Sequence, residues 1–89
     1  MLEPKKKKFV IELDSRWVLK HRNDDELPIA AMMSELSKDK TLTIKETSHT
    51  SLTVIYSEQN ADYSGLKGFV MRFLKSRYPE DNIKEIVSF

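Results

Sequence analysis

The spacing of the apolar residues switches between two periods along the chain, and this switching constrains the fold more than any other feature. Residues 9–22, 41–59 and 82–89 alternate apolar and polar positions, which is the period of a half-buried strand. Residues 23–40 and 60–79 repeat their apolar positions at the spacing of an amphipathic helix. Because a turn divides the middle alternating stretch, the predicted order of elements is β-α-β-β-α-β.

This order predicts a single α+β domain over residues 9–89, with a ferredoxin-like arrangement. Two helices would cover one face of a four-stranded antiparallel sheet, because each helix must bury its apolar stripe against another layer. A chain of 89 residues is long enough for one such domain with a modest core. The preceding residues 1–8 end in four consecutive lysines and are predicted to be a basic, flexible lead-in.

The first alternating stretch extends well beyond the length of an average strand. The apolar series that begins at Phe9 continues at every second position to Trp17 and beyond, with one interruption. One long strand over residues 9–22, bent or bulged near Ser15, is the preferred prediction. The alternative is a hairpin with a two-residue turn at Asp14 and Ser15, although its pairing would mix apolar and charged side chains on each face.

Residues 23–40 carry the signals of a helix start. Asn23, Asp24 or Asp25 can cap the first turn, and Pro28 is tolerated only near that turn. The predicted buried stripe consists of the apolar residues at helical spacing, which are Ile29, Met32, Met33 and Leu36.

Residues 41–59 are predicted to form a β-hairpin. Leucine, isoleucine and valine alternate with threonine on both sides of a turn near residues 47–50. Threonine and the β-branched residues favour strands over helices.

Residues 60–79 combine a helical apolar stripe with a basic surface. Asp62 or Ser64 can cap the start of this helix, and Pro79 would stop it. The stripe is predicted to comprise Leu66, Phe69, Val70, Phe73, Leu74 and Tyr78.

Within this helix, the segment KGFVMRF (Lys67–Phe73) resembles the octapeptide of RNA-recognition domains. That family shares the βαββαβ order and stacks RNA bases on aromatic side chains of its sheet. The segment here lacks the second Gly-Phe step, and it falls in the second helix instead of the third strand. The helical interpretation is therefore preferred over an RNA-binding signature.

Basic residues form the candidate binding surface. They fall into a lysine run, a set in the first alternating stretch and a set in the second helix. The members are Lys5, Lys6, Lys7, Lys8, Arg16, Lys20, Arg22, Arg72, Lys75 and Arg77. If these sets converge, they could bind phosphates or an acidic protein surface. The alternative is a solvated exterior, because the formal net charge is only +1.

The composition argues against catalytic and metal-binding classes. The chain has no cysteine, and His21 and His49 lack partners at metal-ligand spacing. No glycine-rich phosphate loop is present, since the glycines are Gly65 and Gly68. The sequence therefore predicts a protein that is not an enzyme and has no cofactor or metal. The N-terminal apolar stretch is too short for a membrane helix or a signal peptide, so a cytoplasmic location is expected.

These observations predict a small, non-catalytic binding protein that modulates or inhibits a macromolecular partner. Virus- or phage-encoded accessory proteins that act on a host factor are commonly of this type. A protein partner is preferred, without membrane contact, and a homodimer through the final strand as a sheet edge is a further option. The alternative function is RNA or DNA binding through a basic surface on the ferredoxin-like domain.

Overall fold

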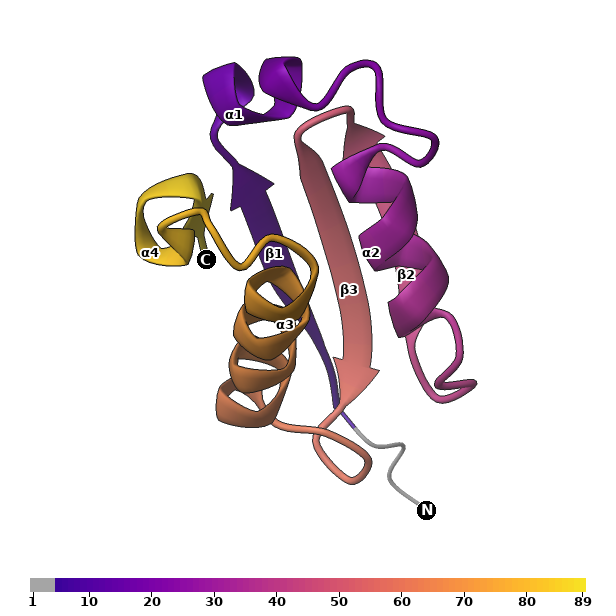
Figure 1. Ribbon diagram of the computed structural model, residues 1–89. Helices are drawn as coiled ribbons and strands as arrows, with labels where there is room; N and C mark the ends of the chain where they lie inside the picture. The colour runs from indigo at the N-terminus through magenta and orange to yellow at the C-terminus, as the bar shows by residue number, and fades with distance from the viewer. Residues whose placement is uncertain (1–4) are drawn as a thin grey trace.

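The computed structural model describes residues 5–89 (Figure 1). The elements in chain order are β1 (Lys6–Leu13), α1 (Ser15–Lys20), α2 (Pro28–Leu36), β2 (Thr43–Ser48), β3 (Ser51–Ser57), α3 (Tyr63–Arg77), α4 (Ile83–Ile86) and β4 (Val87–Ser88). The predicted lead-in over residues 1–8 lies partly outside the described residues. Its last three lysines belong to β1, so the first strand begins before the predicted position.

The strands form one sheet in the order β2-β3-β1-β4 with antiparallel neighbours throughout. β1 and β2 are therefore parallel to each other and separated by β3. In the same way, β3 and β4 are parallel and separated by β1. Parallel strands need a long crossover connection, and α2 and α3 lie in these two connections.

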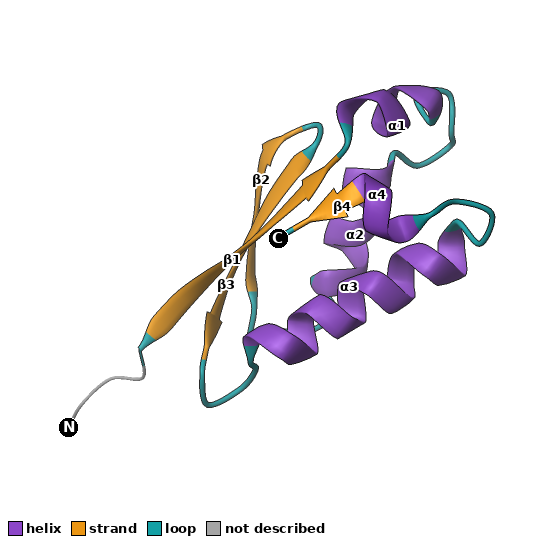
Figure 2. Ribbon diagram, turned by 90° about the vertical axis from the view of Figure 1, so that its left-hand side faces the viewer, coloured by secondary structure: helices purple, strands orange, loops and turns teal. Residues whose placement is uncertain are grey.

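The helices α2, α3 and α4 lie on one side of the sheet, and the other face has no covering layer in the described chain (Figure 2). The core forms between the two layers. Its most deeply buried side chains are Phe9, Ile11, Ile29, Met32, Leu52, Val54, Val70 and Leu74. The predicted single α+β domain with a four-stranded antiparallel sheet is confirmed, but two additional short helices make the predicted number of helices wrong.

The first additional helix replaces the second half of the predicted long strand. β1 ends at Leu13, and Asp14 caps α1 by accepting a hydrogen bond of 3.0 Å from the backbone N–H of Trp17. A strand would bury only alternate residues, whereas α1 buries the adjacent Trp17 and Val18. The prediction of one strand over residues 9–22 and the alternative hairpin are therefore both wrong.

Helix α2 begins later than its acidic signal indicated. Asn23, Asp24 and Asp25 lie in the connection before the helix, and α2 starts at Pro28 without a side-chain cap. The predicted place of Pro28 in the first turn is confirmed, since a missing N–H costs nothing there.

The hairpin and the long helix α3 agree with the predictions. β2 and β3 pair around a turn at residues 49–50, with a bulge near Thr47. Asp62 caps α3 by accepting a 2.6 Å hydrogen bond from the backbone N–H of Gly65. The segment that resembles the RNA-recognition octapeptide lies entirely within α3.

The C-terminal stretch is mostly helical, where an alternating strand was predicted. Ile83 and Ile86 are both buried, and their spacing fits one turn of helix α4. The strand β4 keeps only two residues, which pair with Glu12 and Leu13 at the end of β1.

Candidate binding face of the sheet

The uncovered face of the sheet is the surface that the fold leaves open to a partner. Cross-strand neighbours share a face. The register therefore aligns Lys8, Ile55 and Thr43 in one row across β1, β3 and β2, and Val10, Thr53 and Lys45 in the next row. The residues of the open face are Lys6, Lys8, Val10, Glu12, Thr43, Lys45, Thr53 and Ile55, and the buried Ser51 and Ser57 lie on the same side of the sheet.

The open face is basic around an apolar centre. Lys6, Lys8 and Lys45 are exposed, and none of them forms an ion pair within residues 5–89. Val10 is 41% exposed on this face. Glu12 is the acidic residue among these positions, and it lies at the β4 end. The face therefore offers one sign of charge over most of its length.

Lys7 points to the opposite side of β1 and has a different role. Its ammonium group pairs with the carboxylate of Glu58 in the loop after β3. The contact raises the pKa of Lys7 and lowers the pKa of Glu58, in both cases mainly through their hydrogen bond. Because both side chains are about half exposed, this pair adds little stability.

The second predicted set of basic residues lies at the other end of β1. Arg16 and Lys20 are exposed on α1, and Arg22 follows the helix. The guanidinium of Arg22 donates a 3.0 Å hydrogen bond to the carbonyl of Leu19. A strand of this length separates α1 from the lysine run by about 23 Å, so these sets do not converge.

The third predicted set lies on α3, across the sheet from the open face (Figure 2). Arg72, Lys75 and Arg77 are exposed there. Arg77 lies 3.6 Å from the carboxylate of Glu26 in the connection between α1 and α2. The structure thus separates the predicted basic residues into three regions, and only Lys6 and Lys8 belong to the open face.

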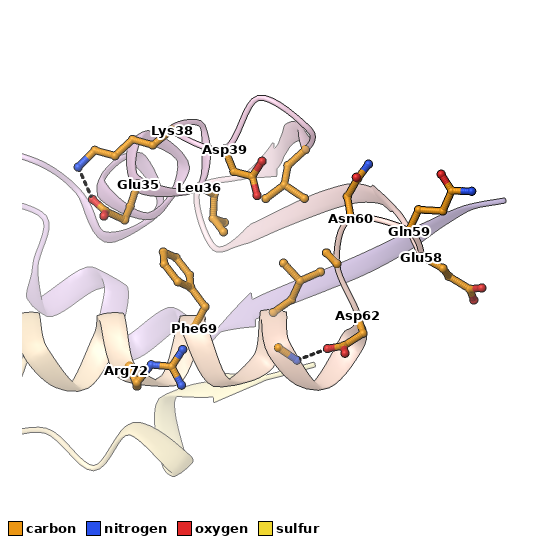
Figure 3. Close-up of a pocket in the computed structure, with 14 residues that line it drawn as sticks. Glu35, Leu36, Lys38, Asp39, Glu58, Gln59, Asn60, Asp62, Phe69 and Arg72 are labelled. Carbon is orange, nitrogen blue, oxygen red and sulfur yellow. Dashed lines mark hydrogen bonds and ion pairs between the residues drawn. The ribbon is translucent and has the colours of Figure 1, made fainter. Parts of the chain in front are cut away.

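A groove of about 760 Å³ lies between the end of α2 and the first half of α3 (Figure 3). Phe69 points into this groove from α3, and Glu35 on its rim pairs with Lys38 at 3.1 Å. Asp39 accepts hydrogen bonds from the hydroxyl and backbone N–H of Thr41, and these bonds lower its pKa. These charged groups are engaged with their neighbours instead of converging inside the groove.

An aromatic cluster joins α1 to the C-terminal end of α3. The rings of Trp17, His21 and Tyr78 lie 4.7–4.8 Å apart, centroid to centroid. His21 Nδ1 lies 2.8 Å from a carboxylate oxygen of Asp24, which orients the imidazole. The buried hydroxyl of Tyr78 has no hydrogen bond of standard geometry within residues 5–89. Burial raises the pKa of Tyr78, and the neighbouring Arg77 guanidinium partly opposes this rise. This cluster fixes the position of α1 against α3.

In the described part of the chain, no group of three or more His, Cys, Asp or Glu side chains could hold a metal ion. Over the same residues, the helices are too short or too polar to cross a membrane.

Comparison of the chain with family models, with curated proteins and with solved structures finds no match. The candidate site therefore depends on the geometry of this chain alone.

Sequence reasoning missed Lys45 and Val10 as members of the binding face. Alternation from Phe9 placed Val10 on the opposite side of the first strand, but Lys6 and Lys8 were assigned to the flexible lead-in. The place of Lys45 beside them depends on the pairing of three strands, and no local pattern contains that information.

Proposed function

We propose that the protein is a non-catalytic binding module that modulates or inhibits a partner protein by occupying its surface with the open face of the sheet. The observation that carries the proposal is the exposed Val10, which lies among Lys6, Lys8 and Lys45 on a face without a covering layer. An apolar centre within a polar rim is the usual anatomy of a protein interface. The lysine rim favours a partner with an acidic surface, through faster association and better specificity.

The proposal also includes a fold type and a cellular location for this binding activity. We assign the domain to the ferredoxin-like type, supported by two helical crossovers that each span one intervening strand. Its action would be cytoplasmic and directed at a host factor, as for small accessory proteins of viruses and phages. The absence of cysteine is in keeping with a reducing compartment.

Affinity capture with the tagged protein from a native host extract, with and without nuclease, tests the proposal. We expect a defined protein in stoichiometric amount that resists nuclease and is lost with the Lys6→Glu/Lys8→Glu/Lys45→Glu variant. Lys75→Glu on α3 is the matched control for the single variant Lys45→Glu, because each reverses one exposed charge and only Lys45 lies on the open face. Capture that survives the triple variant, or is lost equally with Lys75→Glu, would contradict the assignment of the face.

Nucleic-acid binding through the same face is the second candidate. It is favoured by a hollow of about 420 Å³ at one end of the face, where Lys6 lies near Thr43 and Ser57. A lysine with hydroxyl neighbours can hold a phosphate group. This function predicts that affinity for RNA or DNA falls steeply with salt and that the triple variant reduces the slope by about 3. A captured complex that disappears with nuclease would favour this candidate over the protein partner.

A further inference from the structure

β1 has one edge that no described strand covers. On one side, β1 pairs with β3 over the whole length from Lys6 to Glu12. On the other side, β4 pairs only with Glu12 and Leu13. Within residues 5–89, the β4 side of β1 therefore has no partner strand from Lys6 to Ile11. This stretch is called the open edge of β1.

The backbone groups at this edge can be assigned from two hydrogen bonds at the end of the strand. The N–H of Leu13 donates to Thr50 beside β3 at 2.8 Å, and the N–H of Asp14 donates to Ile86 beside β4 at 2.7 Å. Backbone groups of successive strand residues point to opposite sides, so the even-numbered residues face the β4 side. Lys6, Lys8 and Val10 therefore direct their N–H and C=O groups to the open edge.

Apolar side chains flank this edge on both faces of the sheet. Val10 and Tyr63 are two of the four strongly exposed large apolar residues in the described chain. Val10 lies on the open face, and the ring of Tyr63 lies 5.2 Å from that of Phe9 on the helical side. Phe89 also packs 5.2 Å from Phe9. An added strand, with side chains alternating between faces, would contact Val10 on one side and Tyr63 and Phe89 on the other.

We propose that the open edge of β1 binds an extended, acidic segment of a partner protein, which adds to the sheet as a strand in line with β4. In such strand addition, backbone hydrogen bonds give affinity and flanking side chains give specificity. This inference rests on the proposed protein-binding function and names the chemistry of the partner.

The charges at the edge select an acidic segment. Lys6 and Lys8 lie on one side of the added strand, and Lys67 lies over the ring of Phe89, 5.7 Å from its centroid, on the other. A second copy of β1 fits less well, because an antiparallel pair centred on Lys8 would set two lysines directly opposite each other. Like charges in that position are destabilising.

A peptide titration followed by NMR tests the proposal on the full chain. The probe is a capped peptide of alternating glutamate and valine, about nine residues long, which spans the open edge. One control peptide has lysine in place of glutamate. A second control peptide carries N-methyl groups on every other backbone amide. It is made in two versions, one for each of the two alternating sets of amides, so that one version cannot donate hydrogen bonds to the edge of β1.

We expect the acidic peptide to shift the backbone amide signals of Lys6, Lys8 and Val10. The lysine peptide and one of the two N-methylated versions should fail to bind. Lys6→Glu/Lys8→Glu should weaken binding by about tenfold. Lys45→Glu should leave it nearly unchanged, because β3 separates Lys45 from this edge. Shifts that map elsewhere, unchanged binding of all N-methylated versions, or no binding at millimolar peptide would overturn the proposal.

Self-association is tested by sedimentation of the protein alone. A dimer that the acidic peptide cannot dissociate, and that protects the β1 edge, would show that a second copy occupies the site and would overturn the acidic-segment proposal. If the peptide failed to bind but capture of a partner protein still depended on Lys45, the proposed function of the open face would remain supported. The open-face function and the edge inference can therefore fail separately.

Discussion

The indole N–H of Trp17 donates a 3.0 Å hydrogen bond to the carboxylate of Asp81, which is 64 positions further along the chain. Trp17 is 5% exposed, so its N–H would have little access to water without this partner. The bond ties α1 to the turn before α4, at the same place where His21 and Tyr78 contact the indole ring.

Asp81→Ala should lower the free energy of unfolding by about 1–2 kcal/mol, because a buried donor would lose its acceptor. Urea unfolding at neutral pH measures the change. Asp81→Asn is the matched control, since its amide oxygen can still accept the indole hydrogen bond. Equal losses in the two variants would show that the hydrogen bond to Trp17 is not the cause.

Tyr78→Phe should leave stability at pH 7 unchanged or raise it by about 1 kcal/mol, because the buried hydroxyl has no partner in the described chain. The same variant tests the raised pKa. A raised pKa in the folded state contributes stability that is fully present below the unfolded pKa, near 10, and is lost as the pH rises through the folded value. The wild type should therefore lose stability relative to Tyr78→Phe above about pH 10. Parallel stability curves for the two proteins up to pH 11.5 or so would refute this linkage.

Asp62→Ala should destabilise the protein by about 1 kcal/mol through loss of the cap of α3. Circular dichroism during thermal unfolding gives the comparison with Asp62→Asn, which can still accept from the N–H of Gly65. If alanine and asparagine were equally tolerated, the 2.6 Å cap would contribute nothing measurable.

Leu74→Ala should destabilise by about 2–5 kcal/mol, since Leu74 is fully buried between α3 and the sheet. Leu19→Ala provides a control with the same chemical change on an exposed helix, because Leu19 is 60% exposed. We expect the control to change stability by less than about 0.5 kcal/mol. Denaturant unfolding measures both changes. Similar losses of unfolding free energy in Leu74→Ala and Leu19→Ala would show that Leu74 does not belong to the core.

The elements that could be predicted are those whose signals are local. Helix α3 has an apolar stripe, a capping Asp62 and the stop at Pro79, and each of these signals acts on residues close to it in the chain. The hairpin of β2 and β3 likewise depends on alternation and a short turn.

Helix α1 could not be predicted because its local sequence pattern is that of a strand. The alternation from Phe9 continues through Trp17 and Leu19 as a strand pattern, yet Leu19 is exposed in the structure and Val18 is buried. The tertiary contacts of Trp17 with Tyr78 and Asp81 decide in favour of the helix. Of the binding face, only the position of Val10 opposite Phe9 followed from alternation. Lys6 and Lys8 were assigned to the flexible lead-in, and the place of Lys45 requires the register of the sheet.

The short β4 also divides β1 into two populations of backbone amides. The N–H groups of Phe9 and Ile11 point to β3 and are held in the middle of the sheet, while those of Lys8 and Val10 point to solvent. Hydrogen–deuterium exchange along this one strand should therefore alternate between slow and fast from each residue to the next. Although β1 lies inside the four-stranded sheet, most of its β4 side has no strand partner within residues 5–89.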